Sequence, residues 1–218
     1  MSRINRQDYL FDGCVVHARL QINNGEFHFQ TKAHFNLWKK ITLRYLKKYP
    51  SVRLTGYQWM SNHCHLTLEA DKATDLSRFM HDLSWRFAFT FNKLHKRKGH
   101  LFQNRFRCSV IDKNEYEQTV QRYIYQNQIR AGMVKHVRHT RWSSYPFYAY
   151  GKADPLITPF RTYGLFGAEK KVRMLQFRNF VETQMDHEDR LWQKKLVHPH
   201  LKTKKEVLRN YLMKSGYG

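Results

Sequence analysis

Apolar residues recur along this chain with two different periods, which together predict a mixed α+β fold. From His63 to Glu69, apolar and polar residues alternate strictly, which is typical of a half-buried strand with one polar face. Apolar spacings of three and four residues predict amphipathic helices over 32–49 and 76–93. Further strands are predicted over 14–20, 52–60 and 106–111.

A third helix is predicted over 114–130. Asn114 is a favourable N-cap residue, and Glu117 stands where the acidic partner of a capping box would lie. Gly132 indicates the end of this helix, because glycine readily adopts the left-handed conformation that closes one. The predicted helix contains a cluster of tyrosines whose positions are considered below.

The composition of the chain changes near residue 150. Residues 142–150 are aromatic and irregular, and the glycine and prolines that follow are typical of a linker. From about residue 168 the sequence is polar and helical, and it is strongly basic over 190–218. We therefore expect an α+β catalytic or binding domain over 1–150, and a linker with a basic helical C-terminal extension over 151–218.

The charge of the chain implies a polyanionic partner. Its 39 Lys and Arg against 17 Asp and Glu give a formal net charge of +22. A hydrophobic content of 41% and an aromatic content of 15% favour a packed core over disorder. We expect nucleic acid rather than a membrane as the partner, because no long apolar run and no separate basic amphipathic helix is present.

The cysteines point to a reducing compartment. The chain has three, at positions 14, 64 and 108, with no Cys-x-x-Cys spacing. An odd number without metal-ligand spacing is typical of small core residues rather than of disulfides or a zinc site. We therefore expect a cytoplasmic protein.

Two histidines form the sharpest candidate for chemistry. His63 and His65 lie two positions apart on a predicted strand, so their side chains share one face and could bind a single divalent ion. The Cys64 side chain between them would point to the core. Taken alone, the triplet is more typical of two ordinary histidines on a polar face than of a metal site.

The predicted helix over 114–130 offers a candidate nucleophile. Tyr123 and Asn127 are four positions apart and therefore neighbours on one helical face. Tyr125 lies roughly 200° round the helix from Tyr123, so the two tyrosines cannot face the same site. A helical tyrosine is most often a packing residue, and this alternative stays open for each of them.

Several basic residues are candidates for contact with DNA. Arg105 and Arg107 alternate with phenylalanines, a pattern that suits phosphates and unstacked bases but also fits a strand with solvated arginines. Arg122 and Arg130 flank the tyrosines and could clamp a phosphate. A further basic run follows the second helix and consists of His95, Lys96, Arg97 and Lys98.

Four segments together resemble one known family. These segments read Gln-Trp-Met-Ser-Asn-His-Cys-His-Leu (58–66), Gly-His-Leu-Phe-Gln-Asn-Arg-Phe (99–106), Arg-Tyr-Ile-Tyr-Gln-Asn-Gln-Ile-Arg-Ala-Gly (122–132) and Arg-Trp-Ser-Ser-Tyr (141–145). In order and spacing they are similar to the single-tyrosine transposases that carry a His-hydrophobic-His (HUH) strand, particularly the REP-associated tyrosine transposases. The resemblance covers about residues 9–150.

The resemblance implies a fold, a reaction and roles for individual residues. The fold would be a central antiparallel sheet with helices packed against it, of the HUH nuclease type. His63, His65 and Asn127 would bind a divalent ion, Mg²⁺ or Mn²⁺, and Tyr123 would be the nucleophile. The substrate would be single-stranded or hairpin DNA, cut through a covalent 5′-phosphotyrosine. Gln128 stands where the family commonly has proline.

Alternatives to this reading are a catalytically silent module that binds hairpin DNA or RNA, and a replication or conjugation nickase. Family members act either as homodimers or alone, and the sequence does not choose between these states.

Overall fold

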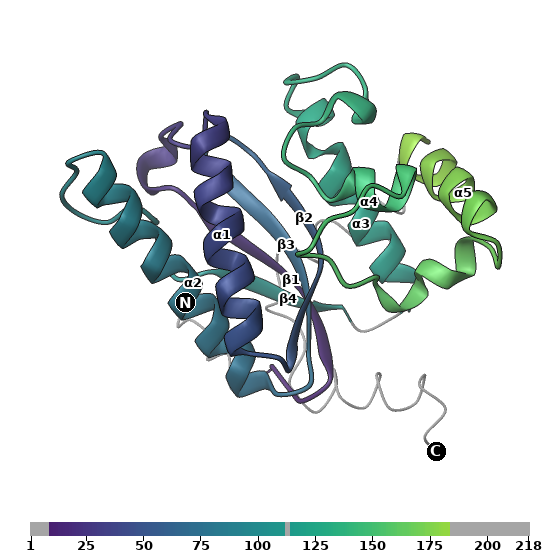
Figure 1. Cartoon of the computed structure of the whole chain (residues 1–218), viewed down its shortest axis with the longest axis horizontal. Helices are drawn as coiled ribbons and strands as arrows, with labels where there is room; N and C mark the ends of the chain where they lie inside the picture. Colours follow the sequence, from purple (N-terminus) through teal and green to yellow (C-terminus); the bar gives the residue numbers. More distant parts are fainter. Residues whose placement is uncertain (1–8, 112–113, 184–218) are drawn as a thin grey trace.

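The computed structural model describes residues 9–111 and 114–183, and its centre is a four-stranded sheet (Figure 1). The strand order is β2-β3-β1-β4, and every neighbouring pair is antiparallel. The predicted antiparallel sheet and α+β class are therefore confirmed. The strands are β1 (Cys14–Gln21), β2 (Val52–Trp59), β3 (His63–Ala70) and β4 (Arg107–Ile111).

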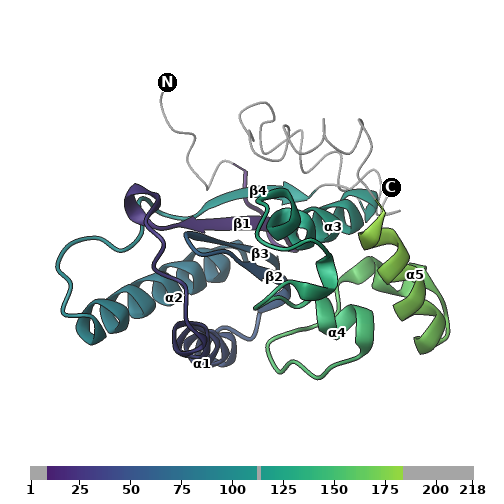
Figure 2. The same cartoon turned by 90° about the horizontal axis from the view of Figure 1, so that it is seen from above.

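One face of the sheet is apolar and is covered by two long helices, α1 (Lys32–Lys48) and α2 (Ala73–Leu94) (Figure 2). Every second residue of the strands points to this side, where Val16, Leu66 and Leu68 are fully buried. Each such side chain contributes roughly 1.5–3 kcal/mol through burial of apolar surface. This core fixes the register of the sheet, because a slip of one residue would turn its apolar side chains to the other face.

The opposite face of the sheet is polar, and helix α3 lies across it. A second apolar cluster, to which Ile124, Tyr148 and Phe177 belong, joins α3 to α4, α5 and the short helix η4. These elements group around α3 in both views of the chain (Figures 1 and 2). The helices are α3 (Asn114–Arg130), α4 (Tyr145–Tyr150) and α5 (Lys170–Glu182), and the 3₁₀ helices are η2 (Asn23–Gly25), η3 (Val137–His139) and η4 (Arg161–Phe166).

The alternation of β3 suggested that its polar face is open to solvent. In the structure this face is covered. His65, Thr67 and Glu69 are all buried, because α3 and η4 contribute side chains that cover this side. Hydrogen bonds replace water there: Gln121 of α3 donates to the hydroxyl of Thr67 at 2.9 Å. A buried polar layer of this kind is stable only when its groups find partners, so it ties the position of α3 to the sheet.

Two local predictions about this region were wrong. Glu117 does not form a capping box, because its carboxylate accepts hydrogen bonds from the backbone and hydroxyl of Thr162 in η4, at 3.1 and 2.9 Å. Residues 142–150 are also more regular than expected, since 145–150 form α4. Both differences arise from contacts with distant segments, which local sequence patterns do not encode.

The Trp-Ser-Ser-Tyr segment covers the outer edge of β2. The backbone of Trp59 donates to the carbonyl of Trp142 at 3.1 Å, and the backbone of Tyr57 donates to the hydroxyl of Ser144 at 2.8 Å. The same hydroxyl pairs with that of Tyr125 on α3 at 2.9 Å. The segment therefore satisfies an exposed sheet edge and links it to α3.

Residues beyond 150 contribute directly to the described core. Leu156, Phe160, Phe177 and Val181 are buried, the first against the α1–α2 side and the others beside α3. The boundary proposed at residue 150 stays a prediction, and the basic stretch over 190–218 lies outside the described residues. Within the described part of the chain, no helix has both the length and the apolar character needed to cross a bilayer.

A buried carboxylate connects β3 to η4. Glu69 accepts hydrogen bonds from Arg161 at 2.6 Å and from Arg53 at 2.7 Å. Burial alone would raise the pKa of Glu69, but these two guanidinium groups outweigh it and lower the pKa below its ordinary value. The carboxylate is therefore charged in the folded protein under ordinary conditions.

We expect Glu69→Gln to lower the free energy of unfolding by about 2 kcal/mol at pH 7, because charge-assisted hydrogen bonds are lost. The stabilisation is present above the ordinary carboxyl pKa of about 4.3 and disappears as the pH falls, so the gap to wild type should close in acid. Urea unfolding at several pH values measures this difference in the free energy of unfolding. Asp71→Asn is the control: Asp71 also pairs with Arg53 but is 56% exposed, and its loss should cost well under ~1 kcal/mol.

Candidate functional site

The two histidines of β3 point at one another on the polar face of the sheet. Their Nε2 atoms are 3.1 Å apart, with His65 buried and His63 partly exposed. Burial lowers the pKa of His63 to about 3, assisted by the nearby charge of Arg19. Burial lowers the pKa of His65 well below its usual value too, with His17 and His63 adding to the effect. Both imidazoles are therefore neutral near pH 7, which is the form that binds metals.

A third histidine, His17 of β1, supports this pair. Its Nε2 lies 2.8 Å from Nδ1 of His65, and the two rings stack with centroids 5.1 Å apart. Burial, with a contribution from Arg19, lowers the pKa of His17 to about 4. Because the bond occupies Nδ1 of His65, the Nε2 atom is left to face His63. His17 therefore holds the ring of His65 in place, as residues hydrogen-bonded to a metal-binding histidine commonly do.

Tyr123 contacts the histidine cluster from α3. Its ring meets those of His65 and His17 edge-on, with centroids 5.6 and 5.7 Å apart. The guanidinium of Arg130 lies 5.3 Å from the centre of the Tyr123 ring. Tyr125 is fully buried, and its hydroxyl pairs with Ser144. The helical geometry predicted that only one of these tyrosines could face the site, and the structure confirms this.

Arg19 adds a cation to the same place. It lies opposite His65 on β3 and opposite Arg107 on β4. The pKa of Arg19 is lowered, mainly by burial. The nearby Tyr123 raises this pKa and so opposes part of the effect of burial. An arginine nevertheless stays protonated at neutral pH. Its buried Nε makes no hydrogen bond among the described residues.

Sequence reasoning missed both His17 and Arg19. The sequence holds a weak indication of their role. The two residues flank Ala18 on a predicted strand and therefore share a face. Nothing local, however, indicates that β1 lies beside β3. This adjacency joins residues 48 positions apart in the His17–His65 pair.

Asn127 lies one turn beyond Tyr123, as expected, but its amide is turned to its own helix. Its Nδ2 donates to the carbonyl of Tyr123 at 3.0 Å. Among the described residues, no group of three or more His, Cys, Asp or Glu side chains is arranged to hold a metal. The role of Asn127 as a third ligand therefore stays a prediction.

Gln128 closes the C-terminal end of α3 against the sheet. Its Nε2 donates to the carbonyls of Trp59 and Arg141 at 2.7 and 3.0 Å, and its Oε1 accepts from the backbone of Arg141 at 3.1 Å. A proline at this position has no side-chain amide and could make none of these bonds. The departure from the family pattern thus anchors the end of α3 to β2, the strand that pairs with the histidine strand β3.

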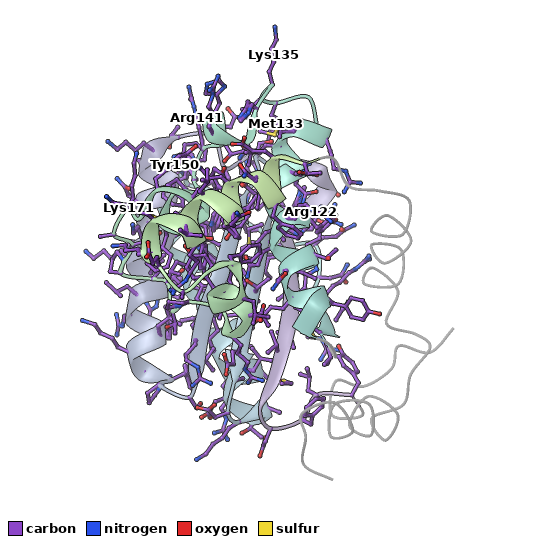
Figure 3. The ribbon with its side chains drawn as sticks, turned by 90° about the vertical axis from the view of Figure 1, so that its right-hand side faces the viewer. Arg122, Met133, Lys135, Arg141, Tyr150 and Lys171 are labelled. Atoms are coloured by element: carbon purple, nitrogen blue, oxygen red, sulfur yellow. The ribbon has the colours of Figure 1, made fainter. Side chains whose placement is uncertain are left out.

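The basic residues predicted to contact DNA lie in different environments. Arg105, Arg107 and Arg130 are exposed. Arg122 is buried on α3 and stacks over the ring of Phe180 in α5, at 4.3 Å, so the structure does not bring it to the tyrosine site (Figure 3).

In the basic run after α2, two residues bond to neighbouring side chains and two are exposed. His95 pairs with His34 at 3.0 Å, and Arg97 bonds to Asn92 at 2.9 Å. Lys96 and Lys98 are exposed. The two lysines are therefore the members of this run that are best placed to meet a phosphate.

An antiparallel sheet that presents a His-apolar-His strand to a tyrosine-bearing helix defines the HUH single-tyrosine class of fold. The chain belongs to the IS200-like transposase family, whose model matches residues 13–127, more than half of the sequence. No protein of curated function matches the chain.

A solved structure of a REP-associated tyrosine transposase, bound to a REP hairpin, has the same fold. It is 18% identical to this chain, covers 74% of this chain and 96% of its own, and superposes with a TM-score of 0.59. The tRNA(His) guanylyltransferase of Saccharomyces cerevisiae is 12% identical over 84% of this chain and 85% of its own. Its TM-score of 0.42 is too low to bear on fold or function.

Proposed function

We propose that this transposase-family protein is a metal-dependent endonuclease and strand transferase that acts on single-stranded DNA at hairpins or palindromes. The observation that carries the proposal is the edge-on contact between the ring of Tyr123 and that of His65, whose neutral imidazole faces the neutral imidazole of His63. A phenol that can attack phosphorus and nitrogens that can hold a cation are thereby brought together from two distant parts of the chain.

The histidine pair fits a divalent ion. The Nε2 atoms of His63 and His65 are 3.1 Å apart. Two nitrogens that each lie about 2.1 Å from one ion have this separation when the N–ion–N angle is close to a right angle. Mg²⁺ and Mn²⁺ favour oxygen in their remaining positions, which the Asn127 amide and a DNA phosphate would supply. When bound, the ion would polarise the scissile phosphate and offset its negative charge.

The reaction we propose is a transesterification. The phenolic oxygen of Tyr123 attacks phosphorus, a new P–O bond forms, and the bond from phosphorus to the 3′ oxygen breaks. The phenol proton is lost and the leaving oxygen takes up a proton, so the products are a 5′-phosphotyrosine and a free 3′-OH. Because bond energy is retained in the phosphotyrosine, the reverse step can rejoin a strand.

The cations around Tyr123 suit this chemistry. Arg130 lies over the ring and Arg19 is near enough to interact electrostatically with Tyr123, so both would stabilise negative charge as it develops on the attacking oxygen and the phosphate. Arg105, which lies just before β4, and Arg107, the first residue of β4, would hold the backbone of the same DNA strand. Binding should therefore weaken steeply as the salt concentration rises.

The hairpin part of the proposal is supported by the fold. The REP-associated transposase that shares this fold is bound to a REP hairpin. We propose that this chain likewise grips a folded hairpin and cuts an unpaired segment next to it.

A catalytically silent module that binds hairpin nucleic acid is the second candidate. The observation that favours it is the Asn127 amide, whose Nδ2 is held by the backbone of α3 and not by a group at the histidine pair. Such a module would bind DNA with the same cations but would form no covalent product.

One experiment separates the two candidates. The protein is incubated with palindromic single-stranded oligonucleotides labelled at either the 5′ or the 3′ end, with Mg²⁺ or Mn²⁺ or with EDTA. We expect a metal-dependent adduct on a denaturing gel that carries the 3′ label alone, since tyrosine retains the downstream strand. Binding on a native gel without an adduct at a verified target site would support the silent module.

The position of His17 leads to a prediction about metal affinity. We expect His17→Ala to weaken Mn²⁺ binding and the metal dependence of adduct formation by roughly 10- to 100-fold, as for other partners of metal-ligating histidines. His17→Gln should recover part of this loss, because an amide can still hydrogen-bond to Nδ1 of His65. Paramagnetic resonance of free Mn²⁺ measures binding without DNA. Unchanged affinity in a stably folded His17→Ala protein would show that His17 only fills space.

A further inference from the structure

Helix α2 carries an aromatic pair that the core does not use. Trp85 and Phe89 are 53% and 52% exposed, although the same helix buries Phe79, Leu83 and Phe87 completely. The two exposed rings stack on one another, with centroids 5.6 Å apart and planes inclined by 17°. Two large aromatic side chains held together in solvent suggest a binding surface, because they contribute little to folding.

Cations surround this pair along the exposed side of α2. The guanidinium of Arg86 lies 5.1 Å from the centre of the Trp85 ring. Arg78 is exposed about two turns before the pair, and Lys93 is exposed one turn after it. With Trp85 and Phe89, these residues form what we call the α2 stripe. Aromatic faces alternate with positive charges along it.

The acidic residues nearby do not cancel this charge. Asp82 accepts hydrogen bonds from Lys48 and Tyr49 at 2.7 and 2.8 Å. Asp75 accepts from the hydroxyl of Ser51 at 2.6 Å. Both carboxylates are thus bonded to α1 or to the segment that follows it. Asp75 also pairs with Arg78 at 3.9 Å, so the positive character of the stripe comes from Arg86 and Lys93.

We propose that the α2 stripe binds unpaired nucleotides of a nucleic acid strand. Bases would stack on Trp85 and Phe89 while Arg86 and Lys93 meet the phosphates, which is how single strands are held without sequence preference. Charge complementarity favours this occupant over a second copy of the chain, since two stripes would bring like charges together in a protein of net charge +22.

The stripe is separate from the site around Tyr123. Helices α2 and α3 cover opposite faces of the sheet, so a strand on α2 would be held away from the tyrosine (Figure 2). The stripe would therefore retain the single-stranded DNA that flanks a hairpin while another part of it is cut. This role rests on the proposed function, but binding at the stripe can be measured without any cleavage.

The test compares two DNA probes in EDTA, where no cutting is expected. One is a blunt hairpin, and the other is the same hairpin with an unpaired dT extension of about ten nucleotides. We expect the double variant Trp85→Ala/Phe89→Ala to bind the extended hairpin roughly 10- to 100-fold more weakly than wild type does, and the blunt hairpin with unchanged affinity. Fluorescence anisotropy of labelled DNA measures both.

A matched control removes two exposed apolar side chains elsewhere. Leu165 and Val172 are 75% and 43% exposed, in η4 and α5, and Leu165→Ala/Val172→Ala should bind both probes as wild type does. Equal losses on both probes, or none, would overturn the proposal. A wild-type dimer in light scattering that the α2 variant abolishes would assign the stripe to self-association instead. Normal binding with no adduct under metal would contradict only the proposed cleavage.

Discussion

A Tyr123→Phe protein is expected to form no covalent adduct with DNA, and its cleavage rate should fall by roughly 10³-fold or more. Phenylalanine lacks the oxygen that would attack phosphorus, so no alternative route to a phosphotyrosine remains at this position. The ring itself would still pack edge-on against His65 and His17, so the fold and DNA affinity should be preserved. Denaturing gels measure the adduct, and native gels measure the affinity.

Tyr125→Phe is the matched control for this variant. Tyr125 lies two positions along the same helix, but its hydroxyl is buried and pairs with Ser144. We expect nearly normal cleavage and a loss of about 1 kcal/mol in the free energy of unfolding, for one hydrogen bond. An inactive Tyr125→Phe beside an active Tyr123→Phe would reverse the assignment of the nucleophile.

The second large effect is expected from the histidine pair. His63→Ala and His65→Ala should each reduce metal-dependent cleavage by at least about 10²-fold and retain most of the affinity for hairpin DNA. DNA affinity should be retained because the histidines are neutral, and the charges that attract phosphate belong to Arg105, Arg107 and Arg130. Adduct formation over a series of Mn²⁺ concentrations, and binding in EDTA, separate the two properties.

His139→Ala provides the comparison for the histidine variants. His139 is exposed in η3, and its loss should change neither property. Wild-type protein in EDTA should reproduce the behaviour of the histidine variants. Loss of both cleavage and DNA binding in a folded His63→Ala protein would show that the pair contacts DNA rather than a metal.

The local geometry of the site follows from the periods of strands and helices alone. A strand turns its side chains with a period of two, so His63 and His65 had to share a face, and the structure confirms that they do. A helix turns by about 100° per residue, so Tyr123 and Tyr125 had to diverge, and they do. The strands and two of the long helices followed from the same periods, whereas the helix over 114–130 followed from its cap residue Asn114 and from Gly132 at its end.

Tertiary structure decided everything that depends on which segments meet. The pairing of β1 with β3 brings His17 behind His65 and Arg19 beside Tyr123, and no periodicity within β1 indicates this. The packing of α5 on α3 buries Arg122 against Phe180, although on the sequence it stands directly beside Tyr123. Periodicity reports which face of an element is buried, whereas the partner on that face is selected by long-range packing of the whole chain.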